Sequence, residues 1–486
     1  MCGPVCPPNT IRPHPFAQSN YQLSTIITTT IMANPLISNH HGKNGKYTQA
    51  FLDQNGPGDA RPTALDILKD NDRIGTMKDK VFLLTGSSGG IGIETARALA
   101  ATGGKVYLGV RDLEKGKQTL SSLLEPNRVE LLELDIGSMD SVRTAAKTFL
   151  SKSTQLNVLI NNAGIMACPE AKTADGFESQ LAINYLGHFL LYKLLEPTLL
   201  SSSTPEFHSR VVNVSSAGHH MSSVVLDNIN LEGEYEAWKA YGNAKTACIW
   251  MTNEIERRYG ARGLHGLALM PGGIATDLQR HVDPEMLKQW GSSEPSRKYG
   301  KSPAQGAATT MTAAFGKEWE GKGGVYLEDC QEAGPIPEGG TLAVGVAPHA
   351  FDPEGEKKLW ALSLKMLGLE DHKGSKFSCA SQISDGSGRQ LSESCCISIF
   401  RTKTDKVSRI LQGLMSSQGL KLRDLLHSQE QSDTAPARIY WSIPAPTTST
   451  VDLVNLEALL KQPTSLRMPF LAVFRTGRFS SSKKRS

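Results

Sequence analysis

The sequence predicts an α/β fold in which helices cover both faces of a doubly wound, parallel sheet of about seven strands. Between residues 80 and 369, short apolar runs alternate with stretches of helical length. The runs are apolar almost throughout, which is typical of strands that are buried on both faces. A glycine-rich turn joins the first run to the first helical stretch, and turns of this kind open doubly wound sheets.

Each expected strand leaves room for one helix or more before the next strand begins. In chain order the strands are VFLLTG (81–86), KVYLGV (105–110), VELLELDI (129–136), LNVLINNAG (156–164), RVVNVSS (210–216), HGLALMPGG (265–273) and GGVYL (323–327). This order of strands and helices places all the strand ends that carry polar residues at one edge of the sheet.

Composition divides the chain into three parts. Residues 1–65 show no sustained period and are expected to be a largely disordered extension, in which Met32 offers a second possible start besides Met1. Residues 66–370 form the expected α/β domain. Residues 371–486 carry 17 Lys and Arg against 9 Asp and Glu, and we expect a poorly structured basic tail of linker and short helices. A solvated tail is favoured over one that contacts RNA or anionic lipid.

The bulk composition argues against several classes of protein. A net charge of +4 on 486 residues is too small to indicate nucleic-acid binding. No run of 18 apolar residues suggests a membrane span, and no secretory signal is evident, so a cytoplasmic location is expected. The eight cysteines lack metal-ligand spacing, so they indicate free thiols and no metal site.

The turn TGSSGGIG, Thr85–Gly92, follows the first strand and opens the first helix. Glycines there permit a tight turn and let backbone N–H groups approach a pyrophosphate at the helix N-terminus. The context of strand, turn and helix therefore predicts a dinucleotide site of the Rossmann type. Its candidate residues are Gly86, Ser88, Gly90, Ile91 and Gly92.

The ends of the next three strands predict the rest of the cofactor site. Arg111 ends the second strand, and its guanidinium suits the 2′-phosphate of NADP. Two alternatives stay open, because Asp112 could accept from the ribose of NAD and Arg111 could merely solvate a strand end. Asp135 ends the third strand and could accept from the adenine amino group. Asn162, in NNAG, lies where a cofactor ribose would pass.

In YGNAK, Tyr241 and Lys245 are four residues apart and would share one face of a helix. A free tyrosine has a pKa of about 10, so it is a poor base at neutral pH. A nearby ammonium group, together with the cationic ring of an oxidised nicotinamide, favours the phenolate and brings that pKa toward the working pH. In isolation, a solvated surface contact is the favoured interpretation of the pair, and only the other motifs favour an active site.

Together, TGSSGGIG, NNAG, NVSS and YGNAK resemble the short-chain dehydrogenase/reductase family, in this order and over residues 78–369. Within it, the chain resembles the retinol-dehydrogenase-like and fungal NADP-dependent members, to which APHAFDPEGEKKLWALS (347–363) is also similar. The resemblance implies that Ser216, with Ser215 as the fallback, bonds the substrate carbonyl. It implies that Tyr241 is the general acid/base and Lys245 its helper. The further roles implied are a water-holding Asn184 in NYLGHF, and Ile274 and Thr276 in PGGIAT as ligands of the nicotinamide carboxamide or a phosphate.

The expected function is therefore interconversion of an alcohol with a ketone or aldehyde by an NADP(H)-dependent oxidoreductase, with a role in fungal secondary metabolism. One alternative is a C=C reductase of the protochlorophyllide-reductase-like type, and another is a non-catalytic NADP-binding partner protein. The family resemblance implies a homodimer or homotetramer and a small-molecule substrate. Residues 277–301 fall where the family keeps a substrate lid, with an apolar wall expected from Leu278, Met286, Leu287 and Trp290. His219 and His220 line either the substrate mouth or, as we favour, a solvated loop.

Overall fold

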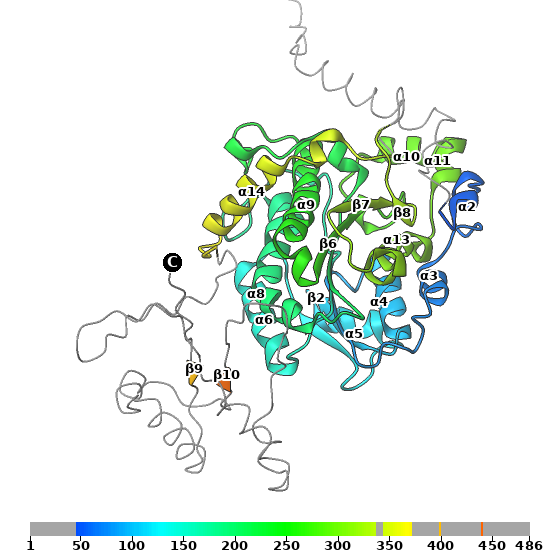
Figure 1. Cartoon of the computed structure of the whole chain (residues 1–486). Coiled ribbons are helices and arrows are strands. Elements are labelled where there is room, and N and C mark those ends of the chain that lie inside the picture. Colours follow the sequence, from blue (N-terminus) through cyan, green and yellow to red (C-terminus); the bar gives the residue numbers. More distant parts are fainter. Residues whose placement is uncertain (1–44, 337–343, 372–397, 400–438, 441–486) are drawn as a thin grey trace, which may run out of the picture. The chain divides into compact units, whose positions relative to one another are not determined.

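The computed structural model describes residues 45–336, 344–371, 398–399 and 439–440 (Figure 1). The chain divides into two compact units, Met1–Asp371 and His372–Ser486. In the second unit the described residues are β9 (Ser398–Ile399) and β10 (Ile439–Tyr440), which pair in antiparallel fashion. The expected disorder of residues 1–44 and the expected short helices of the tail lie outside the described residues.

The first unit is built on an eight-stranded sheet in the order β3-β2-β1-β4-β5-β6-β7-β8 (Figure 1). The strands are β1 (Val81–Leu84), β2 (Lys105–Val110), β3 (Val129–Glu133), β4 (Val158–Asn161), β5 (Ser209–Val214), β6 (Leu264–Leu269), β7 (Val325–Glu328) and β8 (Gln331–Glu332). The first seven are parallel, which confirms the doubly wound fold and its strand positions. The eighth strand pairs antiparallel with β7. It consists of two polar residues, so the pattern of apolar runs did not predict it.

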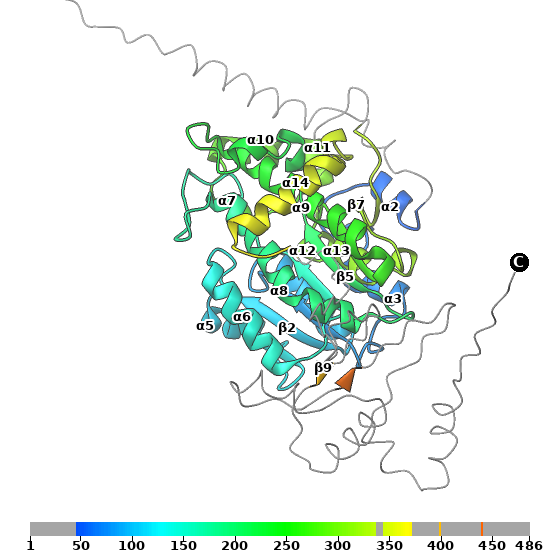
Figure 2. The same ribbon diagram turned by 60° about the vertical axis from the view of Figure 1, so that its left-hand side comes forward.

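Helices cover both faces of the sheet, as the continuous apolar strands require (Figures 1 and 2). On one side pack α3 (Ala64–Asp70), α4 (Ile91–Ala101), α5 (Leu113–Leu120) and α13 (Ala308–Phe315). On the other pack α6 (Met139–Lys152), α8 (Gly187–Ser202), α9 (Ala237–Tyr259) and α14 (Pro353–Met366). Within β1, Phe82 and Leu83 point to opposite layers and are both fully buried, so alternation along the strand serves two cores.

The helix α9 carries the YGNAK motif through the middle of the unit. It begins where the Glu236 side chain accepts a hydrogen bond from the Lys239 N–H, and most of its residues are buried. Trp250, halfway along it, donates from Nε1 to the carbonyl of His349, 2.9 Å away. A helix held in this way along its length fixes the side chains at its beginning.

Order begins earlier along the chain than the sequence predicts. Residues 45–65, expected to belong to a disordered extension, contain α2 (Thr48–Leu52) and the start of α3, whose first turn Thr63 caps. Phe51 in α2 is 2% exposed. The composition of this segment indicates disorder because its partners lie more than 200 residues away in the sequence. Among the described helices, none is long and apolar enough to cross a membrane.

Candidate active site

One cavity of about 1780 Å³ opens at the carboxyl edge of the parallel strands. Its walls include the residues that follow β1, β2, β3, β4, β5 and β6. The strand order reverses between β1 and β4, and in doubly wound sheets the ligand crevice lies at that reversal. All the candidate site residues named from the sequence, except Gly92 and Asn184, line this cavity.

The glycine-rich turn after β1 has a geometry that only glycine permits at two positions. Gly86 has φ +66°, in the left-handed region. A Cβ at Gly92 would lie 2.1 Å from the carbonyl oxygen of Gly86, so the turn closes on itself. Gly90 is the N-cap of α4 and no side chain caps the helix, so N–H groups of its first turn, apart from that of Gly92, which donates to the Gly89 carbonyl at 3.0 Å, can bind an anion. This cradle fits the pyrophosphate of a dinucleotide.

The loops after β1 and β4 are tied together by the hydroxyl of Thr85. Its Oγ1 accepts from the backbone N–H groups of Asn162 and Ala163, at 2.9 and 3.0 Å, and lies 2.9 Å from His188 Nε2. Burial lowers the pKa of His188 to about 4, so the imidazole is neutral at neutral pH. Thr85 therefore donates to Nε2, and Nδ1 of His188 donates to the Asn184 carbonyl, 3.0 Å away.

At the end of β2, Arg111 and Lys115 both line the cavity. The Asp112 carboxylate accepts from the backbone N–H of Lys115 at 3.0 Å and so caps the start of α5. Arg111 is exposed on the same rim. Lys115 is a cavity residue that was not predicted from the sequence. Lys115 lies in the first turn of the helix after β2, and this position places it at the same edge of the sheet as Arg111.

The remaining candidate cofactor residues lie around the same cavity. Asp135 lines it and accepts the backbone N–H of Gly137 on Oδ1, at 2.9 Å. Asn162 also lines it, and its Nδ2 donates to the carbonyl of Thr85 at 3.0 Å. Ile274 and Thr276 follow β6 and line the same cavity, and Thr276 lies beside the glycine-rich turn, since a Cβ at Gly90 would be 3.5 Å from its Cβ. The structure therefore brings every named cofactor candidate to one cavity except Gly92, whose backbone supports the turn.

Two adjacent serines after β5 have different surroundings. Ser215 donates from Oγ to the carbonyl of Lys245 at 2.8 Å, so its hydroxyl serves the packing of β5 on α9. Ser216 instead lies beside Tyr241, since a Cβ at Gly218 would be 3.4 Å from Ser216 Oγ and 2.5 Å from Cε1 of Tyr241. The Ser216 Oγ accepts from the N–H of Gly218 at 3.0 Å. Of the two serines, the arrangement therefore favours Ser216 as the partner of a substrate oxygen.

Tyr241 and Lys245 lie one turn apart on α9 and are both buried, at 2% and 4% exposed. The ammonium nitrogen of Lys245 is 5.6 Å from the centre of the Tyr241 ring and donates to the carbonyl of Val214 at 2.9 Å. Burial raises the pKa of Tyr241 above its ordinary value, and the neighbouring Ser216 hydroxyl opposes this. Burial lowers the pKa of Lys245. In the chain alone the phenol is therefore protonated at neutral pH, and a lower pKa of Tyr241 in the presence of oxidised nicotinamide stays a prediction.

Asn184 lies in a π-helical turn, η2 (Ala182–Leu186), directly before α8. Its side chain forms two hydrogen bonds with the backbone of Ile165, donating to the carbonyl at 3.0 Å and accepting from the N–H at 2.9 Å. Asn184 and Lys245 lie close to Gly164 together, since a Cβ there would be 2.7 Å from Asn184 Oδ1 and 3.5 Å from Lys245 Nζ. Its side chain thus holds the loop after β4, and its role with a water stays a prediction.

An apolar wall faces Tyr241 from the segment that follows β6. That segment contains α10 (Pro284–Ser292) and α11 (Glu294–Tyr299), and it packs with Trp238 from the start of α9. Trp238 lies 6.2 Å from both Tyr241 and Trp290, between ring centres. The expected members of the wall, Leu278, Met286, Leu287 and Trp290, all pack in this cluster with Met166, Ala167 and Val282.

The two histidines after Ser216 are not in a solvated loop. His219 is fully buried, donates from Nδ1 to the carbonyl of Ser216 at 2.7 Å and accepts from the N–H of Ala347 on Nε2 at 3.0 Å. Burial lowers the pKa of His219 to about 3, so it is neutral. His220 lines the cavity and contacts the carbonyl of Gly345 at 2.9 Å. The favoured expectation was wrong because the partners come from residues 344–350, far along the chain.

The chain is similar to known proteins over this same region. The family model described as short chain dehydrogenase matches residues 80–287. Short-chain dehydrogenase/reductase prx1 of Penicillium rubens is 91% identical over 340 residues, which cover 70% of this chain and all of that protein. Oxidoreductase calI of Penicillium decumbens is 45% identical over 328 residues, covering 65% of this chain and 95% of that protein. Human retinol dehydrogenase 12 is 37% identical over 294 residues, covering 60% and 87%.

Proposed function

The chain belongs to the short-chain dehydrogenase/reductase family, and on that premise we propose that it is an NADP(H)-dependent oxidoreductase that interconverts an alcohol with its ketone or aldehyde. The observation that carries the proposal is that Ser216 and the buried Tyr241 lie beside each other at Gly218 and both line the cavity. Lys245 supports it from one turn further along the same helix. These three groups can bind, polarise and protonate an oxygen atom of a substrate.

In the direction of reduction, the carbonyl oxygen of the substrate accepts hydrogen bonds from the hydroxyls of Ser216 and Tyr241. When bound, NADPH supplies the hydride that the carbonyl carbon takes up. Tyr241 gives its proton to the oxygen, so that one hydride and one proton complete the alcohol. Because burial keeps the phenol protonated in the chain alone, Tyr241 is prepared for the reductive direction. Asn184 holds the loop against which Lys245 lies.

The cofactor would lie with its pyrophosphate over the turn at Gly86 and Gly90, where the start of α4 offers N–H groups. Two cations, Arg111 and Lys115, line the rim where the adenosine ribose would end. The Asp112 carboxylate, which could select NAD, is engaged as the cap of α5. This balance of charge supports NADP over NAD.

A role in fungal secondary metabolism is part of the proposal, and the relatives from two species of Penicillium support only the likeness to fungal oxidoreductases. A cytoplasmic location and a homodimer or homotetramer stay predictions. The reaction product distinguishes the C=C reductase alternative from the proposed carbonyl reductase. Incubation with a conjugated enone and NADPH, followed by product analysis, yields the allylic alcohol if the carbonyl is reduced and the saturated ketone if the double bond is.

A titration with NADPH and NADH tests the cofactor assignment. We expect Arg111→Ala to weaken NADPH binding by about 10- to 100-fold, the worth of a charge-assisted hydrogen bond, and to leave NADH binding unchanged. Lys115→Ala should act in the same direction with a smaller effect. Arg97→Ala is the matched control, because Arg97 is exposed on α4 and pairs with Glu94. Equal weakening of both cofactors, or tighter NADH binding by the wild type, would contradict the proposal.

A further inference from the structure

A segment before the first strand forms part of the cavity wall. Residues 45–63, which we call the strap, contain α2 and run alongside α11 (Figures 1 and 2). Asn55, Gly56 and Pro57 of the strap line the same cavity as Tyr241. The backbone N–H of Gly56 donates to the carbonyl of Lys298 at 3.1 Å. The strap therefore contacts both the lid segment, which we define as residues 277–301, and the cavity.

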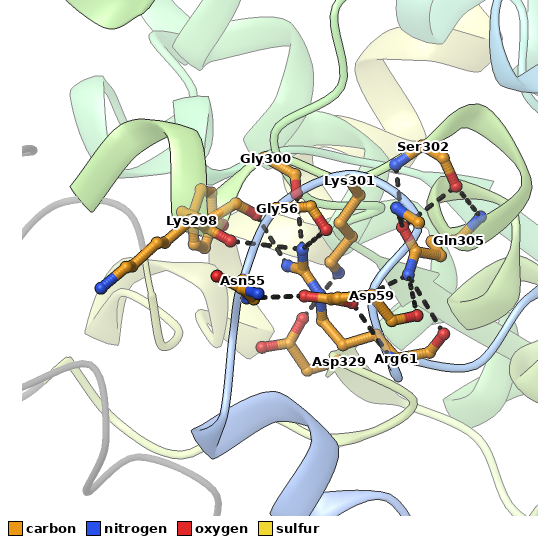
Figure 3. A network of polar contacts seen from close by, with 12 residues as sticks. Asn55, Gly56, Asp59, Arg61, Lys298, Gly300, Lys301, Ser302, Gln305 and Asp329 are labelled. Carbon is orange, nitrogen blue, oxygen red and sulfur yellow. Dashed lines mark hydrogen bonds and ion pairs between the residues drawn. The ribbon is translucent and has the colours of Figure 1, made fainter. Parts of the chain in front are cut away.

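Arg61 fastens the strap to the end of α11, as Figure 3 shows. Its guanidinium donates to the carbonyls of Tyr299 at 2.8 Å, Gly300 at 2.5 Å and Lys298 at 3.3 Å. The last carbonyls of a helix have no partner within the helix, and a side chain that donates to them serves as its cap. Arg61 is 2% exposed, so it caps the lid helix from inside the protein.

The charge and the position of Arg61 are themselves fixed. Asp59 accepts from Nε of Arg61 at 2.8 Å, and the two side chains are 8% and 0% exposed. Gln305 donates from Nε2 to Asp59 Oδ1 at 2.9 Å and to the carbonyl of Arg61 at 3.1 Å. A buried cation that is paired and bonded at this many points holds its geometry, whereas one left without its partner is costly.

The residue that follows the capped carbonyls reaches the loop after β6. Lys301 donates from its backbone N–H to the carbonyl of Gly273 at 2.8 Å. Its ammonium group donates to the carbonyl of Pro271 at 3.1 Å and to Asp329 at 2.6 Å, and it lies 5.0 Å from the ring centre of Phe51 in the strap. Lys301 thus holds both ends of the backbone at residues 271–273, directly before Ile274.

We propose that Arg61 is a positioning residue of the site, which sets the place of the lid and, through residues 298–301, of the cofactor-facing loop that begins at Pro271. It touches neither the reacting groups nor the turn at Gly86, so it acts through the backbone that it holds. The inference rests on the proposed function for the identity of the cofactor. The link between strap and lid rests on the contacts alone.

Arg210 provides a matched comparison within the same chain. It is also fully buried, it donates to the carbonyls of Ala313 and Gly316 at the end of α13, and it pairs with Glu320. Its side chain lies at the start of β5, at the opposite edge of the sheet from the cavity. Substitution of either arginine removes the cap of a helix end, but only Arg61 caps the lid.

The test compares Arg61→Lys with Arg210→Lys in the full chain. Lysine keeps the charge but cannot present a planar fork to several carbonyls. For Arg61→Lys we expect the Kd for NADPH to rise about tenfold, because the binding-competent arrangement of residues 271–301 would be populated only about one tenth of the time. We also expect amide hydrogen exchange in residues 271–301 to accelerate without cofactor. For Arg210→Lys we expect lower thermal stability, an unchanged Kd and unchanged exchange in residues 271–301.

Asp59→Asn is a second variant, which keeps Arg61 and removes its counter-ion, and we expect the same two changes at similar size. Equal effects of the Arg61 and Arg210 variants on the Kd and on exchange would reduce Arg61 to a structural residue and overturn the inference. Unchanged exchange in residues 271–301 in both Arg61→Lys and Asp59→Asn would also overturn it. A wild-type chain that does not bind NADPH would refute the proposed function instead, and exchange would still test the strap.

Discussion

The two walls of the cavity are built in different ways. One, the cofactor wall, consists of the turns after β1 to β4, at residues 85–92, 110–115, 134–137 and 161–165. The other, the substrate wall, is formed by residues 55–57 of the strap and by lining residues between 270 and 301. Residues 344–350 do not line the cavity and bond instead to His219 and His220, which follow Ser216. Each turn of the cofactor wall is local in the sequence and ends a buried strand. The substrate wall is held by contacts between segments that lie up to 247 residues apart.

This difference has a physical consequence for substitution. A turn that closes on its own backbone, such as Gly86 on Gly92, has no room for an added atom. A wall held by side-chain contacts between distant segments can shift as a unit when one contact is lost. We therefore expect sharp losses from changes in the cofactor wall and graded losses from changes in the substrate wall. The hydroxyls of Ser216 and Tyr241, which we propose as the reacting groups, line the same cavity.

The largest effect should come from Tyr241→Phe, which removes the proton donor and leaves both walls in place. We expect kcat to fall by about 10²- to 10⁴-fold, the usual worth of a general acid, with the Kd for NADPH unchanged. The measurement is steady-state kinetics with a carbonyl substrate found by screening. Tyr107→Phe, at a buried tyrosine of β2, is the control and should keep its kcat. Full activity of Tyr241→Phe would remove Tyr241 from the mechanism.

The next effect should come from Gly92→Ala, which breaks the cofactor wall. The new Cβ would lie 2.1 Å from the Gly86 carbonyl oxygen, so the turn must move, at about 1–3 kcal/mol of stability. We expect a lower Tm and at least a tenfold weaker affinity for NADPH. Gly89→Ala is the control for stability, because its Cβ would meet no atom within 4 Å. A Gly92→Ala variant with wild-type Tm and affinity would show that this turn tolerates strain.

The same contrast explains what the sequence could predict. The parallel strands and the cofactor candidates were found because each combines a buried apolar run with a polar strand end, which are local signals. The strap was missed because Arg61 acquires its partners only when residues 298–305 fold against it. The prediction for His219 was wrong for the same reason, because its Nε2 accepts from the backbone N–H of Ala347, which lies 128 residues further along the chain. Lys115 was overlooked although its spacing from Arg111 was visible.

The smallest effect should be a pH dependence of the free energy of unfolding, to which His219 contributes. Its pKa is about 3 in the folded chain, against about 6.5 when unfolded, because burial and the neighbouring His220 and His349 disfavour its charged form. The unfolded state therefore takes up a proton first as pH falls. The contribution of the neutral His219 to the free energy of unfolding is fully present above about pH 6.5. It is lost progressively from there toward pH 3, and the loss is about 2 kcal/mol at pH 5.

Urea unfolding of the wild type and of His219→Gln between pH 7.5 and pH 5 measures this contribution. The variant should be less stable at pH 7.5, because the imidazole makes hydrogen bonds with Ser216 and Ala347. Because glutamine cannot take up a proton, the variant should lose about 2 kcal/mol less of its free energy of unfolding on acidification. His188, whose pKa is also low, contributes equally in both proteins and cancels in the comparison. His281→Gln, at an exposed histidine, should keep the wild-type slope. If His219→Gln also keeps that slope, then residues 344–350 do not depend on a neutral imidazole and are held in place by their other contacts.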